Sequence, residues 1–344
     1  MSAIVIALGD PAGIGPEVTF KAIQQLPHHP GIILCLHPKT LDIHHQQAPG
    51  MQPWSGTAVP NTIYYVTPKN LPDIQHNAPD NADNATIAYQ CLLTALHICD
   101  THNIKHLVTA PISKQGFLNA GIPFTGHTTL LQNHFNCPTA AMGFYAKPFS
   151  VVLCTIHIPL SKVEAALTPE CICNTLDNAQ LFAKQSNINK PRIAVAGLNP
   201  HASENGQFGT FEADILAPTL ATYQKEHPNL PLFGPISPDV VFRQAHNGNY
   251  DMVVAMYHDQ GLIPLKLLAF DTAVNVTIGL PICRTSPDHG TAYDIAGSNS
   301  ANPNAMHAAI QYCIHNKKWD VPKWDCHKTP QARPSEKKYR SVGC

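Results

Sequence analysis

The sequence predicts an α/β fold of two domains built on largely parallel sheets. The chain has 344 residues, more than one hydrophobic core usually organises and suited to two domains of roughly 150–200 residues each. Short β-branched runs alternate with segments of helical spacing, as they do in strand–helix–strand units. Apolar residues make up 44% of the chain, an ordinary share for a protein that buries such cores.

Apolar runs bounded by turn residues predict the strands. The first expected strand, residues 4–8, leads through a glycine-rich turn into a helix with Pro16 at its first position. Further strands are expected at 31–36, 62–66, 104–109, 192–198, 251–257 and 273–278, with two more between residues 142 and 154. Helices are expected from residue 18 onward and at 84–99, 175–184, 211–225 and 305–315.

Composition and charge narrow the class of protein. The formal net charge is −1, and no basic cluster indicates nucleic acid as the main partner. No stretch approaches the ~18 uninterrupted apolar residues of a membrane span, and the first residues lack the features of a signal peptide. The eleven cysteines form no CxxC pair, which favours reduced thiols over a disulfide framework. We therefore expect a cytoplasmic globular protein whose partner is neither nucleic acid nor a membrane.

A glycine-rich turn at residues 9–17 (GDPAGIGPE) follows the first strand. Such a unit suits phosphate binding, because N–H groups at the start of a helix face an anion. However, Val18 stands where the dinucleotide-binding fingerprint needs a third glycine, and no Gly-Lys-Ser/Thr follows for a P-loop. Two interpretations stay open: an anion-binding loop, or a tight turn that only joins strand to helix. Asp10 and Glu17 place carboxylates near the start of the helix, where they either favour the helix dipole or contact ligand hydroxyls.

Three of the 20 histidines share one position relative to the predicted strands. His157, His201 and His258 each follow an apolar run, which places each at or beyond the carboxyl end of a strand, where open parallel sheets bind ligands. Three neutral imidazoles with an open fourth position are a known catalytic zinc arrangement. The spacings of 44 and 57 residues match no finger or helical motif, so a metal site would assemble only through the fold or across a subunit boundary. The alternative is three strand-end histidines bonded to backbone.

Charged and polar residues of the last third stand out in a chain that is only 13% charged. Asp259 and Lys266 follow the third of these histidines, Asn275 lies on the next strand, and Arg284 follows it. An Arg fork matches carboxylate or phosphate, while Lys offers a point charge. The alternative is a structural Arg and a Lys whose stem lies along apolar surface.

The segment 288–297 (DHGTAYDIAG) comes next. We expect it to begin as a loop and to lead into a helix. Its Asp294 is either an acceptor for a ribose diol or a helix cap.

Taken together, these segments resemble the 4-hydroxythreonine-4-phosphate dehydrogenase family of vitamin B6 synthesis. The resemblance runs in order from residue 9 to residue 297, almost the whole chain. Its most specific motifs are MYHDQG at 256–261 and DHGTA at 288–292, and the other matching segments are 9–17, 109–114, 124–128, 155–160, 197–201 and 284–297. Two of the segments, at 9–17 and 289–297, are also similar to the isocitrate and isopropylmalate dehydrogenase group, in which such loops hold the nicotinamide coenzyme.

The resemblance implies a two-domain, isocitrate dehydrogenase-like homodimer with the active site in the interdomain cleft, completed by the partner subunit. It implies that a divalent metal (zinc, magnesium or cobalt), shared across the dimer interface, is bound by His157, His201 and His258. The positions that match the family's substrate-binding residues are His127, Thr128, Lys266, Asn275 and Arg284. The implied cofactor-side domain comprises residues 1–120 and 270–330, and the substrate, metal and dimerisation domain comprises 121–269. Independently of the resemblance, the polar composition of the last residues predicts a polar tail at 331–344.

The coenzyme site is implied by analogy with the wider dehydrogenase group. The residues that would line it are Gly13, Gly15, His289 and Asp294. An aspartate at position 294 implies NAD rather than NADP, because it accepts from an unphosphorylated ribose and repels a 2′-phosphate. The chain departs from the family pattern at Thr129, at Ser203 and Asn205 in a loop that is usually richer in glycine, and at residues 298–300.

The implied reaction oxidises the C3 hydroxyl of 4-phosphooxy-threonine (4-hydroxythreonine 4-phosphate), passes hydride to NAD or NADP, and yields a β-keto acid that loses CO₂ to give 3-amino-2-oxopropyl phosphate. Lys266 or Asp259 would relay the proton. Three alternatives stay open. The first is a dehydrogenase of a four-carbon sugar-acid phosphate, such as threonate or erythronate 4-phosphate. The second is a phosphate acyltransferase of similar fold, and the third is a non-catalytic binding protein.

Overall fold

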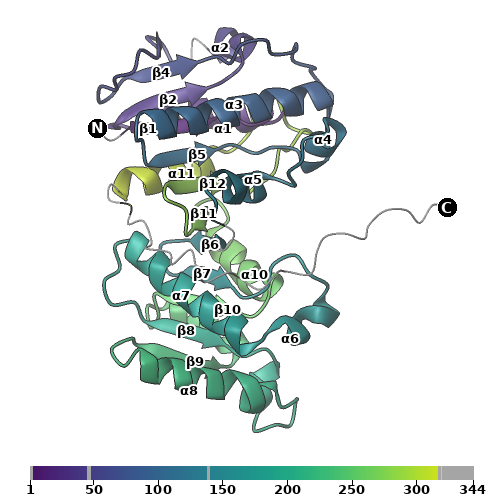
Figure 1. Cartoon of the computed structure of the whole chain (residues 1–344), viewed down its shortest axis with the longest axis vertical. Helices are drawn as coiled ribbons and strands as arrows, with labels where there is room; N and C mark the ends of the chain where they lie inside the picture. The colour runs from purple at the N-terminus through teal and green to yellow at the C-terminus, as the bar shows by residue number, and fades with distance from the viewer. Residues whose placement is uncertain (1–2, 45–47, 138–139, 317–318, 320–344) are drawn as a thin grey trace, which may run out of the picture.

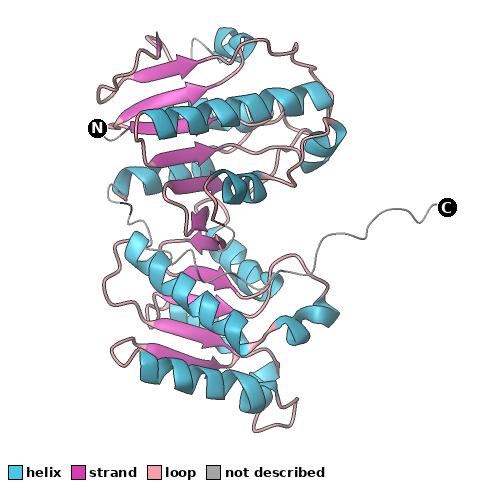
Figure 2. Cartoon of the chain, viewed as in Figure 1, coloured by secondary structure: helices cyan, strands magenta, loops and turns pink. Residues whose placement is uncertain are grey.

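The computed structural model describes residues 3–44, 48–137, 140–316 and 319, and the strands among them form one continuous twelve-stranded sheet. Along the sheet the strands follow the order β3-β4-β2-β1-β5-β12-β11-β6-β7-β10-β8-β9. The strands succeed one another down the length of the molecule, and helices flank the sheet (Figures 1 and 2). The predicted α/β class is confirmed.

Nine of the twelve strands coincide with predicted ones, and the sequence analysis missed β3, β9 and β12. The strands are β1 (Ala3–Ala7), β2 (Gly31–Cys35), β3 (Gln52–Pro53), β4 (Ile63–Val66), β5 (His106–Thr109), β6 (Ala141–Tyr145), β7 (Ser150–Leu153), β8 (Ile193–Ala196), β9 (Leu232–Ile236), β10 (Met252–Ala255), β11 (Val274–Ile278) and β12 (Cys283–Pro287).

The helices include every predicted one except the helix expected in 288–297. They are α1 (Gly15–Gln24), α2 (Pro38–His44), α3 (Ala82–Thr101), α4 (Lys114–Asn119), α5 (His127–His134), α6 (Val163–Ala166), α7 (Pro169–Gln185), α8 (Ala217–Glu226), α9 (Pro238–His246), α10 (His258–Ala269) and α11 (Asn304–His315), with the 3-10 segments η2 (Leu160–Lys162) and η3 (Pro200–Ser203) and the π-helical turn η4 (Glu212–Leu216). The expectation at 288–297 is wrong: this segment stays a series of turns, and the next helix, α11, begins at Asn304.

The strand pairing is largely parallel, as predicted. The exceptions lie in the middle of the sheet, where β11 is antiparallel to β12 and β6, and β6 is antiparallel to β7. After α10 the chain therefore returns to the N-terminal strands, since β12 pairs in parallel with β5. The division of the chain into two domains remains a prediction.

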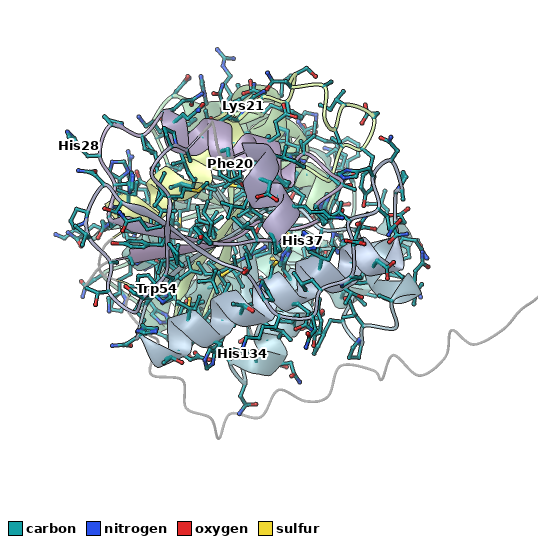
Figure 3. All side chains as sticks on the ribbon, turned by 90° about the horizontal axis from the view of Figure 1, so that it is seen from above. Phe20, Lys21, His28, His37, Trp54 and His134 are labelled. Atoms are coloured by element: carbon teal, nitrogen blue, oxygen red, sulfur yellow. The ribbon has the colours of Figure 1, made fainter. Side chains whose placement is uncertain are left out.

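Burial explains why several strands read as continuous apolar runs. Every residue of β1, β2, β5, β7, β8 and β10 is buried, as parallel strands covered on both faces should be. Phe20 of α1 is fully buried against this sheet and lies in the interior, whereas the exposed His28 lies at the periphery (Figure 3). None of the described helices combines the length and apolarity needed to cross a membrane.

Candidate active site

The three singled-out histidines follow three neighbouring parallel strands. β10 pairs in parallel with β7 on one side and with β8 on the other. His157 comes four residues after the end of β7, His258 three residues after β10, and His201 five residues after β8. The prediction that each lies just beyond the carboxyl end of a strand is therefore confirmed, and this edge is where α/β sheets bind ligands.

Two of these histidines lie side by side. The ring centroids of His157 and His258 are 5.6 Å apart. Asp259 Oδ1 lies 2.7 Å from His258 Nδ1 and accepts its hydrogen, which leaves Nε2 of that ring as the free nitrogen. Burial, helped by the positive charge of Lys114, lowers the pKa of His157, so its imidazole is neutral near pH 7. Two adjacent imidazoles, one of them fixed by a carboxylate, are suited to metal binding.

His201 does not join this pair within one chain. It is exposed on η3, with its ring 6.2 Å from that of Phe208. Among the residues that the structure describes, no group of three His, Cys, Asp or Glu side chains is placed to hold a metal ion. A single chain thus brings together two of the three predicted ligands.

Gln260, which the sequence analysis left without a role, fixes the His258 turn to the neighbouring strand end. Its Oε1 accepts from the backbone N–H of Met256 at 2.7 Å, and its Nε2 donates to the carbonyl of Gly197 at 2.7 Å. The sequence did contain a sign of this role, because Gln260 belongs to the specific motif MYHDQG at 256–261. These bonds set the loops after β10 and β8 relative to each other.

Arg284 is a buried cation whose nearest hydrogen-bond partners are neutral. Its side chain is 3% exposed on β12. The guanidinium donates to Thr109 Oγ1 at 2.7 Å and to Thr277 Oγ1 at 3.1 Å. Burial lowers the pKa of Arg284 to about 10. Burial of His127 likewise holds the pKa of that histidine well below its ordinary value, and the positive charge of Arg284 lowers it further. His127 and Thr128, the first two residues of α5, thus begin that helix beside a desolvated positive charge.

Three buried polar atoms of the predicted substrate and coenzyme residues have no hydrogen-bond partner within the part of the chain that the structure describes. They are Asn275 Oδ1, Arg284 Nε and His289 Nε2. Folded proteins rarely leave such atoms unpaired, so each of these atoms is available to a bound polar group. Arg284 Nε, a charged donor, therefore fits an anion, whereas Asn275 Oδ1 fits a donor such as a hydroxyl or an amine.

Two lysines complete the positive side of the candidate site. Lys266 Nζ lies 3.0 Å from Asp288 Oδ2, which ties α10 to the turns after β12. Lys114, at the start of α4, is exposed and acts electrostatically on His157. The sequence analysis assigned no role to Lys114. Because the chain has few charged residues, Lys114 could have drawn attention for its charge alone.

Most backbone N–H groups of the glycine-rich turn donate to acceptors elsewhere in the same chain or within the turn itself. Ala12 N–H donates to Asp10 Oδ1 at 2.9 Å, Gly13 N–H to Asp10 O at 3.2 Å, and Ile14 N–H to Thr291 O at 2.9 Å. A Cβ on Gly13 would lie 2.8 Å from Thr291 O, so the glycine permits close contact between two loops. Of the two interpretations, this geometry favours the connecting turn over an open phosphate cradle.

The carboxylates of this turn also bond within the chain. Asp10 accepts from the Tyr293 hydroxyl at 2.6 Å; burial raises the pKa of Asp10, and burial with this contact raises the pKa of Tyr293 to about 12. Glu17 accepts from Lys21 Nζ at 2.8 Å and from Ala301 N–H at 2.9 Å. Asp294, in contrast, is exposed. The turn at 9–17 is therefore bonded firmly to the segment that follows β12.

Comparison with known proteins agrees with this architecture. Residues 34–313 match the model of the family described as pyridoxal phosphate biosynthetic protein PdxA. The chain is 37% identical over 322 residues to the D-threonate 4-phosphate dehydrogenase of Pectobacterium atrosepticum, covering 90% of this chain and 98% of that protein. It is 39% identical over 329 residues to the 4-hydroxythreonine-4-phosphate dehydrogenase of Synechococcus sp. (strain RCC307), covering 91% and 99%.

Solved structures give the same result. The crystal structure of 4-hydroxythreonine-4-phosphate dehydrogenase from Klebsiella pneumoniae has a TM-score of 0.81 at 35% identity and covers 92% of this chain and 98% of that chain. A branched-chain phosphotransacylase from Enterococcus faecalis V583, at 15% identity and a TM-score of 0.53 over 92% of this chain and 99% of that chain, shows a likeness of fold alone. The chain therefore belongs to the PdxA family and is a dehydrogenase.

Proposed function

We propose that this dehydrogenase oxidises the C3 hydroxyl of 4-phosphooxy-L-threonine, transfers the hydride to NAD, and releases the keto acid that loses CO₂ to give 3-amino-2-oxopropyl phosphate. The observation that carries the proposal is the buried guanidinium of Arg284, which has neither a carboxylate counterion nor a partner for Nε among the described residues, in a chain that also pairs His157 with His258. A buried cation of this kind calls for an anionic partner. The substrate's phosphate supplies one.

The metal would be held by His157, His258 and His201, the last from a second copy of the chain. When bound, a divalent cation lowers the pKa of the substrate hydroxyl that coordinates it. Imidazole donors suit zinc better than magnesium, so of the expected metals we favour zinc or cobalt. Asp259 orients His258 and keeps its Nε2 available.

An exposed apolar face supports the homodimer. Ile263, Leu267 and Phe270 lie along one side and the end of α10, with 64%, 84% and 65% of each residue exposed. A contiguous apolar face of this kind marks an interaction surface. Because α10 begins at His258, a second copy packed on it would lie beside the two-histidine pair. That position would allow its His201 to complete the metal site.

The remaining side chains divide between binding and proton transfer. Arg284, His127 and Thr128 would hold the phosphate, and the amide oxygen of Asn275, unpaired and buried, would accept from the substrate. Lys266, set in place by Asp288, is our candidate for the residue that relays the hydroxyl proton.

The coenzyme would lie against the turns after β12. His289 Nε2 is an unpaired donor or acceptor there, and exposed Asp294 would accept from the ribose hydroxyls and repel a 2′-phosphate. Gly13 and Gly15 would contribute by allowing the loops to meet closely. NAD as the hydride acceptor suits the cytoplasmic location expected from the sequence.

A second substrate has specific support. The D-threonate 4-phosphate dehydrogenase of Pectobacterium atrosepticum is as similar to this chain as the 4-hydroxythreonine-4-phosphate dehydrogenases are. D-threonate 4-phosphate carries a hydroxyl where 4-phosphooxy-threonine carries the amine, so the same phosphate and metal residues would serve both.

The test is the rate of NADH formation with each substrate, measured with NAD or NADP and with or without a chelator. We expect 4-phosphooxy-L-threonine with NAD to give the highest kcat/KM, and chelation to abolish it. His201→Ala should lose turnover while staying folded. A higher kcat/KM for D-threonate 4-phosphate would show that this compound is the preferred substrate. Full activity after chelation would contradict the proposed dependence on a metal.

A further inference from the structure

The segment that carries His201 has an unusual backbone. Five successive residues adopt left-handed φ angles: His201 (53°), Ala202 (50°), Ser203 (69°), Glu204 (40°) and Asn205 (57°). None is glycine, and non-glycine residues enter this region as isolated cases rather than in runs. The segment 201–205 therefore needs contacts from elsewhere in the chain to keep this conformation.

Glu212 supplies those contacts. It is 4% exposed at the start of the π-helical turn η4, a kind of turn that recurs at functional sites. Its Oε1 accepts from the backbone N–H groups of Leu198 and Asn199, each at 2.8 Å. Its Oε2 accepts from Asn199 Nδ2 at 3.1 Å and from the Ser203 hydroxyl. The Glu212 carboxylate thus bonds both to the residues just before the segment, Leu198 and Asn199, and to its middle residue, Ser203.

The surroundings leave the segment little freedom. A Cβ on Gly197 would lie 2.9 Å from Ala202 and 3.2 Å from Glu212 Oε1, so the chain approaches itself closely there. Although burial works to raise the pKa of Glu212, the hydrogen bonds from Ser203 and Asn199 outweigh it and lower that pKa. The group is an ionised, fully used acceptor.

We propose that Glu212 is a positioning residue whose carboxylate holds residues 201–205 in the left-handed conformation that presents the His201 imidazole to the metal. This inference rests on the proposed function, because it takes His201 as a metal ligand. Glu212 itself touches neither substrate nor coenzyme; it acts through the backbone that carries His201. Ser203 provides the matching donor where a glycine would have adopted the same angle unaided.

The test is cobalt binding by the metal-free dimer, measured by calorimetric titration and by the visible absorption of bound Co²⁺. Glu212→Gln keeps the shape but faces Asn199 Nδ2 with a second donor and removes the charge. We expect it to bind Co²⁺ at least ~10-fold more weakly, as for other groups that orient ligands, and to bind NAD within about twofold of wild type. Glu226→Gln, an exposed carboxylate on α8, is the matched control and should leave both affinities unchanged.

Ser203 variants separate positioning from general destabilisation. Ser203→Gly added to Glu212→Gln should recover part of the Co²⁺ affinity, because glycine adopts a φ of 69° without strain. Ser203→Ala loses the hydroxyl donor, keeps the Cβ, and should weaken Co²⁺ binding by itself; this variant carries the test should Glu212→Gln not fold.

Three results would overturn the inference: unchanged Co²⁺ affinity in Glu212→Gln, an equal loss of Co²⁺ and NAD binding, or no recovery with Ser203→Gly. If the wild-type dimer binds Co²⁺ and His201→Ala does not, those results refute only the role of Glu212. A wild-type dimer that binds no Co²⁺ would refute the proposed metal site and this inference with it.

Discussion

Replacement of Arg284 tests whether its buried charge is kept for an anionic ligand. The drop of its pKa from 12.5 to about 10 corresponds to a burial cost of about 3 kcal/mol for the charged form, at about 1.4 kcal/mol per pKa unit. The two threonine hydroxyls offset part of that cost, and no described residue pairs with Nε. One charge-assisted hydrogen bond to a phosphate contributes about 1.5–3 kcal/mol, or roughly 10- to 150-fold in affinity.

Arg284→Lys keeps the charge but replaces the planar fork, in which three separate nitrogens face the two threonines and the anion, with a single ammonium nitrogen. We expect its KM for the phosphorylated substrate to rise about 10- to 100-fold, with a smaller change in kcat. Arg284→Met should lose the increase in Tm that inorganic phosphate gives the wild type. The assays are initial rates from NADH absorbance and thermal unfolding with and without phosphate. A purely structural arginine would instead lower Tm on replacement and leave both KM and the phosphate effect unchanged, and that result would refute the reasoning.

Three further predictions concern the dimer, the coenzyme loop and pH. Leu267→Lys, at a position 84% exposed, should shift the sedimentation of the protein from dimer to monomer and abolish turnover; an active dimer would contradict the proposed interface. Tyr293→Phe removes the donor to Asp10 and should raise the KM for NAD about 3- to 10-fold through a looser loop, whereas an unchanged KM would show that this bond does not shape the coenzyme site. The Arg192 ion pair lowers the pKa of Asp251, so its stabilisation is complete above the unfolded value of 3.8 and is lost as pH falls through the lower folded value. Asp251→Asn should therefore cost about 1 kcal/mol by urea unfolding at pH 6 and less once the pH falls below 3.8; a cost that stays the same below that pH would contradict this.

Hydrophobic periodicity predicted most of the fold because the parallel strands are buried on both faces. It failed for segments whose secondary structure depends on contacts with distant parts of the chain. α10 carries Pro264 in its interior and leaves Leu267 exposed, so its sequence lacks the one-sided pattern of a helix packed on its own chain. β12 contains the buried Arg284, a residue type that strand patterns place outside. At 288–297, bonds to the glycine-rich turn, such as Tyr293 to Asp10, hold a series of turns where the sequence suggested a helix.

The candidate site was predicted in part for a related reason. The rule that ligands gather at the carboxyl ends of parallel strands placed all three histidines just beyond strand ends, as observed, and two of them, His157 and His258, lie side by side. It could not indicate that His201 would stand apart, because that depends on the backbone angles of one loop. Lys114 and Glu212 were missed, since a single charged residue carries no periodicity and its role emerges only from its contacts.

Subunit complementation tests the central claim, that two histidines of one protomer and one of the other form each metal site. Mixed dimers of His157→Ala and His201→Ala chains would contain one intact site and one doubly altered site. We predict that such dimers, purified with two tags, recover about half of the wild-type activity, because a two-fold symmetric dimer has two equivalent sites. Mixed dimers of His157→Ala and His258→Ala should stay inactive. No recovery in the first pair, or recovery in the second, would contradict the account.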